Sequence, residues 1–130
     1  MNELPALLRA MRPVRNAGTF VFVSVPPATD LRGLDVVATM REPEGLSLVL
    51  REELAQARGF TVLFRAAWIT LTVASDLHAV GLTAAVSTAL ASAGIACNVI
   101  AGAVHDHLFV PVEQAEAALG VLHHLQSGAA

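Results

Sequence analysis

The sequence predicts an α+β fold made of two tandem units, each with an antiparallel sheet and its helices on one face. Residues 67–125 alternate strand and helix patterns in the order strand, helix, strand, strand, helix. Residues 18–66 follow the same order with the first helix reduced to a turn. We therefore expect a degenerate unit over residues 1–66, including an N-terminal helix, and a second unit over residues 67–130, packed together as one body.

The first half begins with a short amphipathic helix over residues 3–11, because Leu4, Leu7, Leu8 and Met11 follow helical spacing. Runs rich in β-branched and aromatic residues, bounded by Pro and Gly, then indicate strands. The elements expected after the first helix are strands at 19–25, 34–41 and 46–50, a helix at 52–58, and an extended segment at 61–64 with a bend at 65–66.

The second half has the clearer pattern. In residues 67–74, Ile69, Leu71 and Val73 share one face of a strand. Residues 81–93 form an alanine-rich helix with an apolar stripe. The remaining elements are a strand at 95–101, a tight turn at Gly102-Ala103, a strand at 105–110 and a helix after Pro111. A strand hairpin between two helices is the split β-α-β, or ferredoxin-like, arrangement, which hosts many functions.

Composition argues against several classes of protein. The sequence has no lysine, its eight basic residues are scattered arginines, and its net charge is −3, whereas nucleic-acid binding leaves a clustered basic footprint. No apolar run approaches the ~20 residues that cross a bilayer, and the N-terminus does not read as a signal peptide, so we expect a cytoplasmic protein without a membrane partner. The single cysteine, Cys97, lies in an apolar strand and is predicted to be a small buried hydrophobe.

A long stretch of the second half resembles a known family. The phrase VGLTAAVSTALASAGIACNVIA matches the loop, helix and strand typical of the ACT domain, and DHLFVPVEQAEAAL matches a strand exit of the same branch. The whole is similar to small bacterial proteins with two ACT-like units in tandem, and EPEGLSLVLREE resembles part of their first unit. One departure concerns the fourth strand of the second unit, which must be missing or supplied by the first half.

The resemblance implies a ligand site at the loop after the first strand of the second unit and at the start of the next helix. A helix N-terminus offers unpaired peptide N–H groups and a positive dipole end, which suit a carboxylate. The alternative is purely structural: Ser75 or Asp76 caps the loop, and backbone groups satisfy Asn98. The residues predicted to bind ligand are Ser75, Asp76, Val80, Gly81, Leu82, Thr83, Asn98 and Ile100.

Histidines invite a metal or catalytic interpretation, which the pattern does not favour. His105 and His107 share one face of a strand, but a metal site needs a third and a fourth ligand. Ser75, His105 and Asp106 supply the parts of a nucleophile, base and acid without the sequence context of a nucleophile elbow. We expect no metal, no cofactor and no enzyme activity. Asp106 is interpreted as closing the hairpin or anchoring a neighbouring backbone.

Two functions remain open. The first is a regulatory sensor that binds a small molecule, most simply an amino acid, and passes its occupancy to a separate protein. The second is a dimerisation or protein-interaction module whose pocket is vestigial. A homodimer is expected under both, because ACT units pair edge to edge and a unit without its last strand has an edge to cover. An RNA-binding domain of this fold would need more exposed aromatics and a basic surface.

Overall fold

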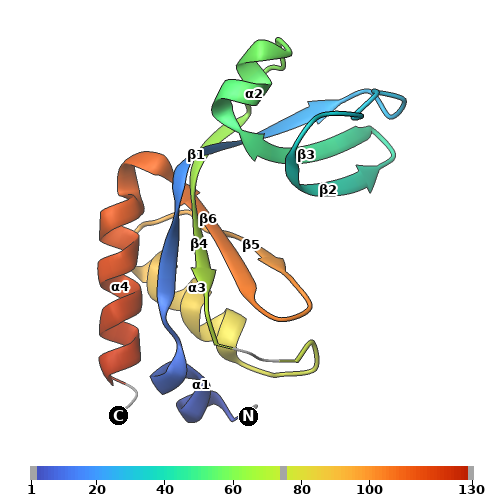
Figure 1. Cartoon of the computed structure of the whole chain (residues 1–130). Helices are drawn as coiled ribbons and strands as arrows, with labels where there is room; N and C mark the ends of the chain where they lie inside the picture. The colour runs from blue at the N-terminus through green and yellow to red at the C-terminus, as the bar shows by residue number, and fades with distance from the viewer. Residues whose placement is uncertain (1–2, 74–75, 129–130) are drawn as a thin grey trace. The chain divides into compact units, whose positions relative to one another are not determined.

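A computed structural model of the chain describes residues 3–73 and 76–128 (Figure 1). The chain divides into two compact units. The larger unit combines Met1–Ala17 with Ala67–Ala130, and the smaller unit is Gly18–Ala66. By their contacts the first 17 residues group with residues 67–130, whereas the sequence placed them with the first half, and the division drawn from the sequence stays a prediction.

The smaller unit is built on a hairpin. Strand β2 (Val36–Glu42) pairs with β3 (Gly45–Arg51), and β3 pairs antiparallel with the second part of β1 (Pro13–Val25). Helix α2 (Glu52–Ala57) follows directly and ends at Arg58, after which Gly59 adopts a left-handed φ of 69°. Val21, Val23 and Val25 of β1 pack with Leu48 and Leu50 of β3 to form a small apolar core.

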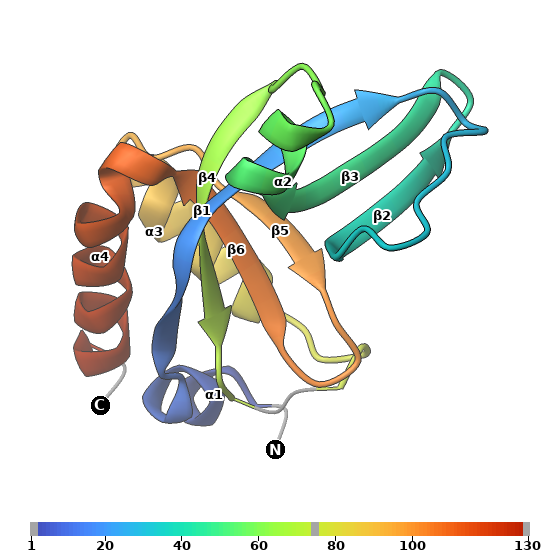
Figure 2. The same cartoon turned by 45° about the horizontal axis from the view of Figure 1, so that its top comes forward.

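The larger unit has the expected helices on one face of its sheet. It contains α1 (Leu4–Ala10), the end of β4 (Phe64–Leu71), α3 (Leu82–Ser92), β5 (Asn98–Ala101), β6 (Asp106–Pro111), η1 (Val112–Gln114) and α4 (Ala115–Gly128). Both views show α3 and α4 covering the same side of β4, β6 and β5 (Figures 1 and 2). The core between these layers contains Leu7, Met11, Ile69, Leu71, Val86, Leu90, Leu108, Val110, Ala118 and Leu122.

The strand missing from the second half is supplied by the beginning of the chain. In the larger unit the strand order is β1-β4-β6-β5, so the first residues of β1 close the sheet beside β4. The Thr72 N–H donates to the Arg12 carbonyl over 3.0 Å, and the Thr72 hydroxyl donates to the same oxygen over 2.8 Å. The ferredoxin-like sheet is therefore completed out of sequence order.

The smaller unit is closed in the reciprocal way. Its strand order is β2-β3-β1-β4, and the Leu63 N–H, just before β4, donates to the Phe22 carbonyl over 2.9 Å. Strand β1 is thus the first strand of the smaller unit and the closing strand of the larger unit. Strand β4 has the opposite roles. Gly18, at the unit boundary, has a left-handed φ of 106°, and a Cβ there would lie 2.9 Å from the Arg51 guanidinium.

Most predicted elements are confirmed, and the differences are local. The N-terminal helix packs against α3 and α4 rather than within the first half. The bend expected at 65–66 is wrong, because β4 runs through these residues. The tight turn at Gly102-Ala103 is also wrong: Ala101 pairs with Asp106, so the loop spans residues 102–105 and is closed by a Gly102 N–H bond to the His105 carbonyl.

The packing predicts that the N-terminal segment stabilises the second half. Met11 is 0% exposed in the core of the larger unit, so Met11→Ala should lower the free energy of unfolding by about 2–5 kcal/mol through lost burial and a cavity. Met40 on β2 is 65% exposed and provides a matched control, with a change within about 0.5 kcal/mol. Urea unfolding followed by circular dichroism measures both. Equal effects of the two substitutions would contradict this packing.

Candidate functional site

A small cavity lies in the larger unit, where the loop before α3 meets the β5–β6 hairpin. Its volume is about 80 Å³. A water molecule occupies ≈ 30 Å³ in the liquid, so the cavity suits a small polar ligand or two to three waters. The lining residues come from the loop, the first turn of α3 and the hairpin: Asp76, Leu77, Ala79, Leu82, Thr83, Ala101, Gly102 and Asp106.

The loop side of the cavity is shaped by Asp76. Its Oδ1 accepts the His78 N–H over 2.9 Å, and its carbonyl accepts the Ala79 N–H over 3.1 Å. This is the local side-chain bond that Asp favours in turns, and it corresponds to the structural alternative drawn from the sequence. Asp76 therefore fixes the loop and is also one of the residues that line the cavity.

The helix side of the cavity is the start of α3. Gly81 occupies the N-cap position with a left-handed φ of 104°, and among the described residues no side chain caps the first turn. The early peptide N–H groups of a helix have no partner within the helix. Thr83, in this turn, adds a hydroxyl to the lining. The first turn of α3 and two acidic residues, Asp76 and Asp106, thus line one small cavity.

The predicted site residues divide into three groups. Asp76, Leu82 and Thr83 line the cavity, and Gly81 precedes it in the chain as the N-cap of α3. Ser75 lies outside the described residues. Val80 is 82% exposed and does not line the cavity, and Ile100 does not line it either.

Asn98 is not brought to the cavity. It begins β5 opposite Phe109, whereas the cavity is reached by Ala101 at the other end of the strand. Three residues of extended chain separate them by about 10 Å. Asn98 is exposed and does not line this cavity, and its role in ligand binding stays a prediction.

Sequence reasoning missed the hairpin side of the cavity. Ala101, Gly102 and Asp106 line it, as do Leu77 and Ala79 from the loop. The topology could have indicated it. In this fold the helix after the first strand begins at the end of that strand, and the turn of the following hairpin lies at the same end. Asp106 had been interpreted as closing the hairpin or anchoring a neighbouring backbone, and its pairing with Ala101 also places it at the cavity.

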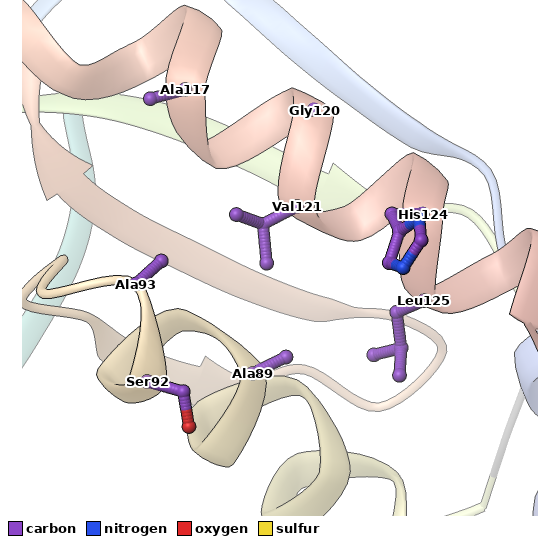
Figure 3. Close-up of a pocket in the computed structure, with 8 residues that line it drawn as sticks. All are labelled: Ala89, Ser92, Ala93, Ala117, Gly120, Val121, His124 and Leu125. Atoms are coloured by element: carbon purple, nitrogen blue, oxygen red, sulfur yellow. The ribbon is translucent and has the colours of Figure 1, made fainter.

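A second hollow lies between the outer sides of α3 and α4. It is an open, mostly apolar groove of about 620 Å³, bounded by Ala89, Ser92, Ala93, Ala117, Gly120, Val121, His124 and Leu125 (Figure 3). Figure 3 shows small side chains of α3 facing Val121 and Leu125 across it. Among its lining side chains Ser92 and His124 are polar and none is a carboxylate, so the groove suits an apolar group better than a zwitterion.

The histidines do not form a metal site. Among residues 3–73 and 76–128 no group of three or more His, Cys, Asp or Glu side chains is placed to hold an ion. The Trp68 indole N–H donates to His107 Nδ1, and Thr70 Oγ1 also lies within hydrogen-bond distance of this nitrogen. His105 Nδ1 lies 3.5 Å from the Val73 carbonyl. Burial raises the pKa of the Cys97 thiol, which favours the protonated thiol over the thiolate. None of the helices in the described part of the chain is long and apolar enough to cross a membrane.

Comparison with protein families gives a consistent result over both halves of the chain. Two family profiles, each described as an ACT domain, match residues 1–67 and residues 64–124. The predicted resemblance is confirmed. No protein with a curated description matches the sequence.

Solved structures place the whole chain in one architecture. A protein of unknown function from Vibrio cholerae, described as a possible transport protein, is 49% identical, with 94% of each chain covered and a TM-score of 0.86. A protein from Agrobacterium tumefaciens is 16% identical, with 89% of each chain covered and a TM-score of 0.74. The ligand-free regulatory subunit of aspartate kinase from Thermus thermophilus is 15% identical, with 89% and 98% covered and a TM-score of 0.65. The last two likenesses concern the fold alone.

The geometry of Gly81 makes a separate prediction. A side chain here would strain the left-handed backbone, and its Cβ would lie 3.3 Å from a Leu4 methyl group. Gly81→Ala should therefore lower the free energy of unfolding by about 1–3 kcal/mol. Gly120→Ala is the control, because that helical position has open space and should gain about 0.5–1 kcal/mol. Thermal melts of both variants measure the difference, and an unchanged melt for Gly81→Ala would contradict the assigned backbone.

Proposed function

Because the chain belongs to the ACT domain family, we propose that it is a regulatory module that binds a small α-amino acid and passes its occupancy to a separate protein. ACT domains are regulatory small-molecule-binding units, and both halves of this chain match the family. The observation that carries the proposal is the 80 Å³ cavity at the start of α3, bordered by Asp76 and Asp106. The chain has no proposed catalytic role, and its cytoplasmic location stays a prediction.

The chemistry of the cavity suits a zwitterion. The uncapped first turn of α3 favours a carboxylate, because peptide N–H groups and the helix dipole both point toward it. The carboxylates of Asp76 and Asp106 favour an ammonium group on the opposite side. The volume of about 80 Å³ leaves little space for a side chain, which favours glycine, alanine or serine over larger amino acids.

A thermal-shift screen over the twenty amino acids tests this function. A ligand at a hundredfold excess over Kd stabilises the folded protein by about 2.7 kcal/mol, which gives a visible rise in Tm. Asp106→Asn should weaken the binding of a ligand that raises Tm by roughly 10- to 100-fold, because a charge-assisted bond to its ammonium is lost. Isothermal titration calorimetry measures this change. Asp35→Asn, an exposed carboxylate in the smaller unit, is the matched control.

The outcomes separate the two functions. Stabilisation by small amino acids that depends on Asp106 but not on Asp35 supports the sensor. A flat response across the whole panel removes the amino-acid sensor and leaves the protein-interaction module. Binding of an amino acid that Asp106→Asn leaves unchanged places the ligand elsewhere in the molecule.

One observation favours assembly as a second function. The sheet edge that was expected to need a partner is already covered by β1, and the edge that remains open in the larger unit is β5. From Ala91 to Val104 the sequence has no charged residue, whereas the edge strand β2 carries Arg41 and Glu42. Charges on an edge strand discourage pairing with another chain, so an uncharged edge is suited to pair with a second copy.

A pair of substitutions tests a homodimer through β5. Asn98 and Ala101 are exposed on this strand, so Asn98→Lys with Ala101→Lys should convert a dimer to a monomer by placing like charges across a twofold axis. Thr39→Lys on the exposed part of β2 is the control and should stay dimeric. Size-exclusion chromatography with light scattering gives the mass of each. A monomeric parent protein, or a dimer that survives both lysines, would exclude pairing through β5.

A further inference from the structure

A chain of hydrogen bonds crosses three strands of the larger unit on the sheet face opposite its helices. The Asn16 side-chain amide on β1 donates to Thr70 Oγ1 over 3.0 Å and to the Trp68 carbonyl over 3.3 Å, both on β4. The Trp68 indole N–H donates to His107 Nδ1 on β6 over 3.0 Å, and Thr70 Oγ1 lies 3.2 Å from the same nitrogen. Asn16, Trp68, Thr70 and His107 therefore connect β1, β4 and β6 through side chains.

The indole N–H of Trp68 determines which ring nitrogen of His107 carries the proton. An indole N–H can only donate, so the Nδ1 that receives it must carry a lone pair and no proton. His107 is then the neutral imidazole with its proton on Nε2. Its ring lies 5.7 Å from the Trp68 ring, and Trp68 stacks on Phe109 at 6.1 Å. The indole is held between an acceptor and an aromatic neighbour.

The charged surroundings of His107 do not favour protonation. On β6 itself, partial burial and the neighbouring His105 lower the pKa of His107, and Asp106 opposes them weakly. No titratable side chain faces His107 from β5 or from residues 67–71 of β4. On β1, Arg15 next to Asn16 is turned to Glu116 of α4 at 3.5 Å. The neutral form seen in the hydrogen-bond geometry is thus the stable form at neutral pH.

We propose that His107 is a proton-operated latch that exchanges Trp68 for Thr70 as its hydrogen-bond partner in mild acid. A proton on Nδ1 would point at the indole N–H of Trp68. Two donors would then face each other with no acceptor between them, and the hydrogen bond from Trp68 to His107 would break. Thr70 Oγ1 already lies within reach of Nδ1, and its oxygen can accept the new N–H. The two partners give His107 two discrete arrangements, and protonation selects between them.

The direction of the pH effect follows from linkage. The pKa of His107 is lowered in the folded state, so the unfolded chain binds the proton more readily. The contribution of His107 to stability is therefore fully present above the unfolded pKa of about 6.5, and it falls as the pH drops below that value. The latch therefore opens at a lower pH than the value of about 6.5 at which an ordinary exposed histidine is half protonated.

Trp68 reports the latch directly. It is the single tryptophan, and the sequence has no tyrosine, so intrinsic emission comes from the residue that bonds to His107. Titration of the full chain from pH 8 to pH 4.5 should show a one-proton change in Trp68 emission, with its midpoint below pH 6.5. His107→Gln keeps an acceptor for the indole and removes the titration, so its emission should be flat over this range.

Further variants separate the latch from a general acid effect. Thr70→Val removes the alternative acceptor and should move the midpoint to lower pH, whereas Thr72→Val, just after the end of β4, should leave it in place, because the Thr72 hydroxyl bonds to the Arg12 carbonyl and not to His107. His105→Gln removes a like charge and should move the midpoint upward. A transition that persists in His107→Gln, or a midpoint that Thr70→Val leaves unchanged, overturns the latch. If either variant fails to fold, nitrogen NMR of the parent protein decides: a proton on Nδ1 at pH 8 would also overturn it.

Discussion

Backbone pairing between β1 and β4 is the constraint on which the rest of this structure depends. A ferredoxin-like sheet is complete only when a fourth strand covers its first strand, and after α4 the larger unit has no further strand to offer in the described chain. The start of β1 fills that place beside β4, and the start of β4 fills the matching place beside β1 in the smaller unit. Two long strands thereby cover one sheet edge of each unit without an added segment.

This reciprocal closure explains why the first 17 residues belong with the second half. Once β1 begins as the closing strand of the larger unit, the helix before it must lie beside that unit. Leu7 and Met11 are then drawn into the core with α3 and α4. The apolar spacing of residues 3–11 predicted the helix correctly, because periodicity is a local property. Its partner could not be predicted, since sequence order places it next to the first half and only strand pairing places it elsewhere.

The same distinction separates the site residues that were predicted from those that were not. Leu82 and Thr83 line the cavity because they open a helix whose start was readable from the pattern. Asn98 lies away from the cavity and Asp106 lines it for one reason: the hairpin loop determines which end of β5 meets the cavity. A two-residue turn was expected, and the four-residue loop at 102–105 instead pairs Ala101 with Asp106 and fixes the cavity end of the strand. The bond from Trp68 to His107 joins residues 39 positions apart, and nothing local in either segment indicates it.

Strand β6 brings the cavity and the hydrogen-bond network together. Side chains alternate across a strand, so adjacent residues meet different environments. Asp106 reaches the cavity at the start of α3, while the next residue, His107, is held by Trp68 on the face away from the helices. A change of partner at His107 acts on the same short backbone segment that positions Asp106. Because packed strands shift as units rather than deforming atom by atom, we expect the proposed exchange of partners at His107 to alter the cavity on the other face of β6.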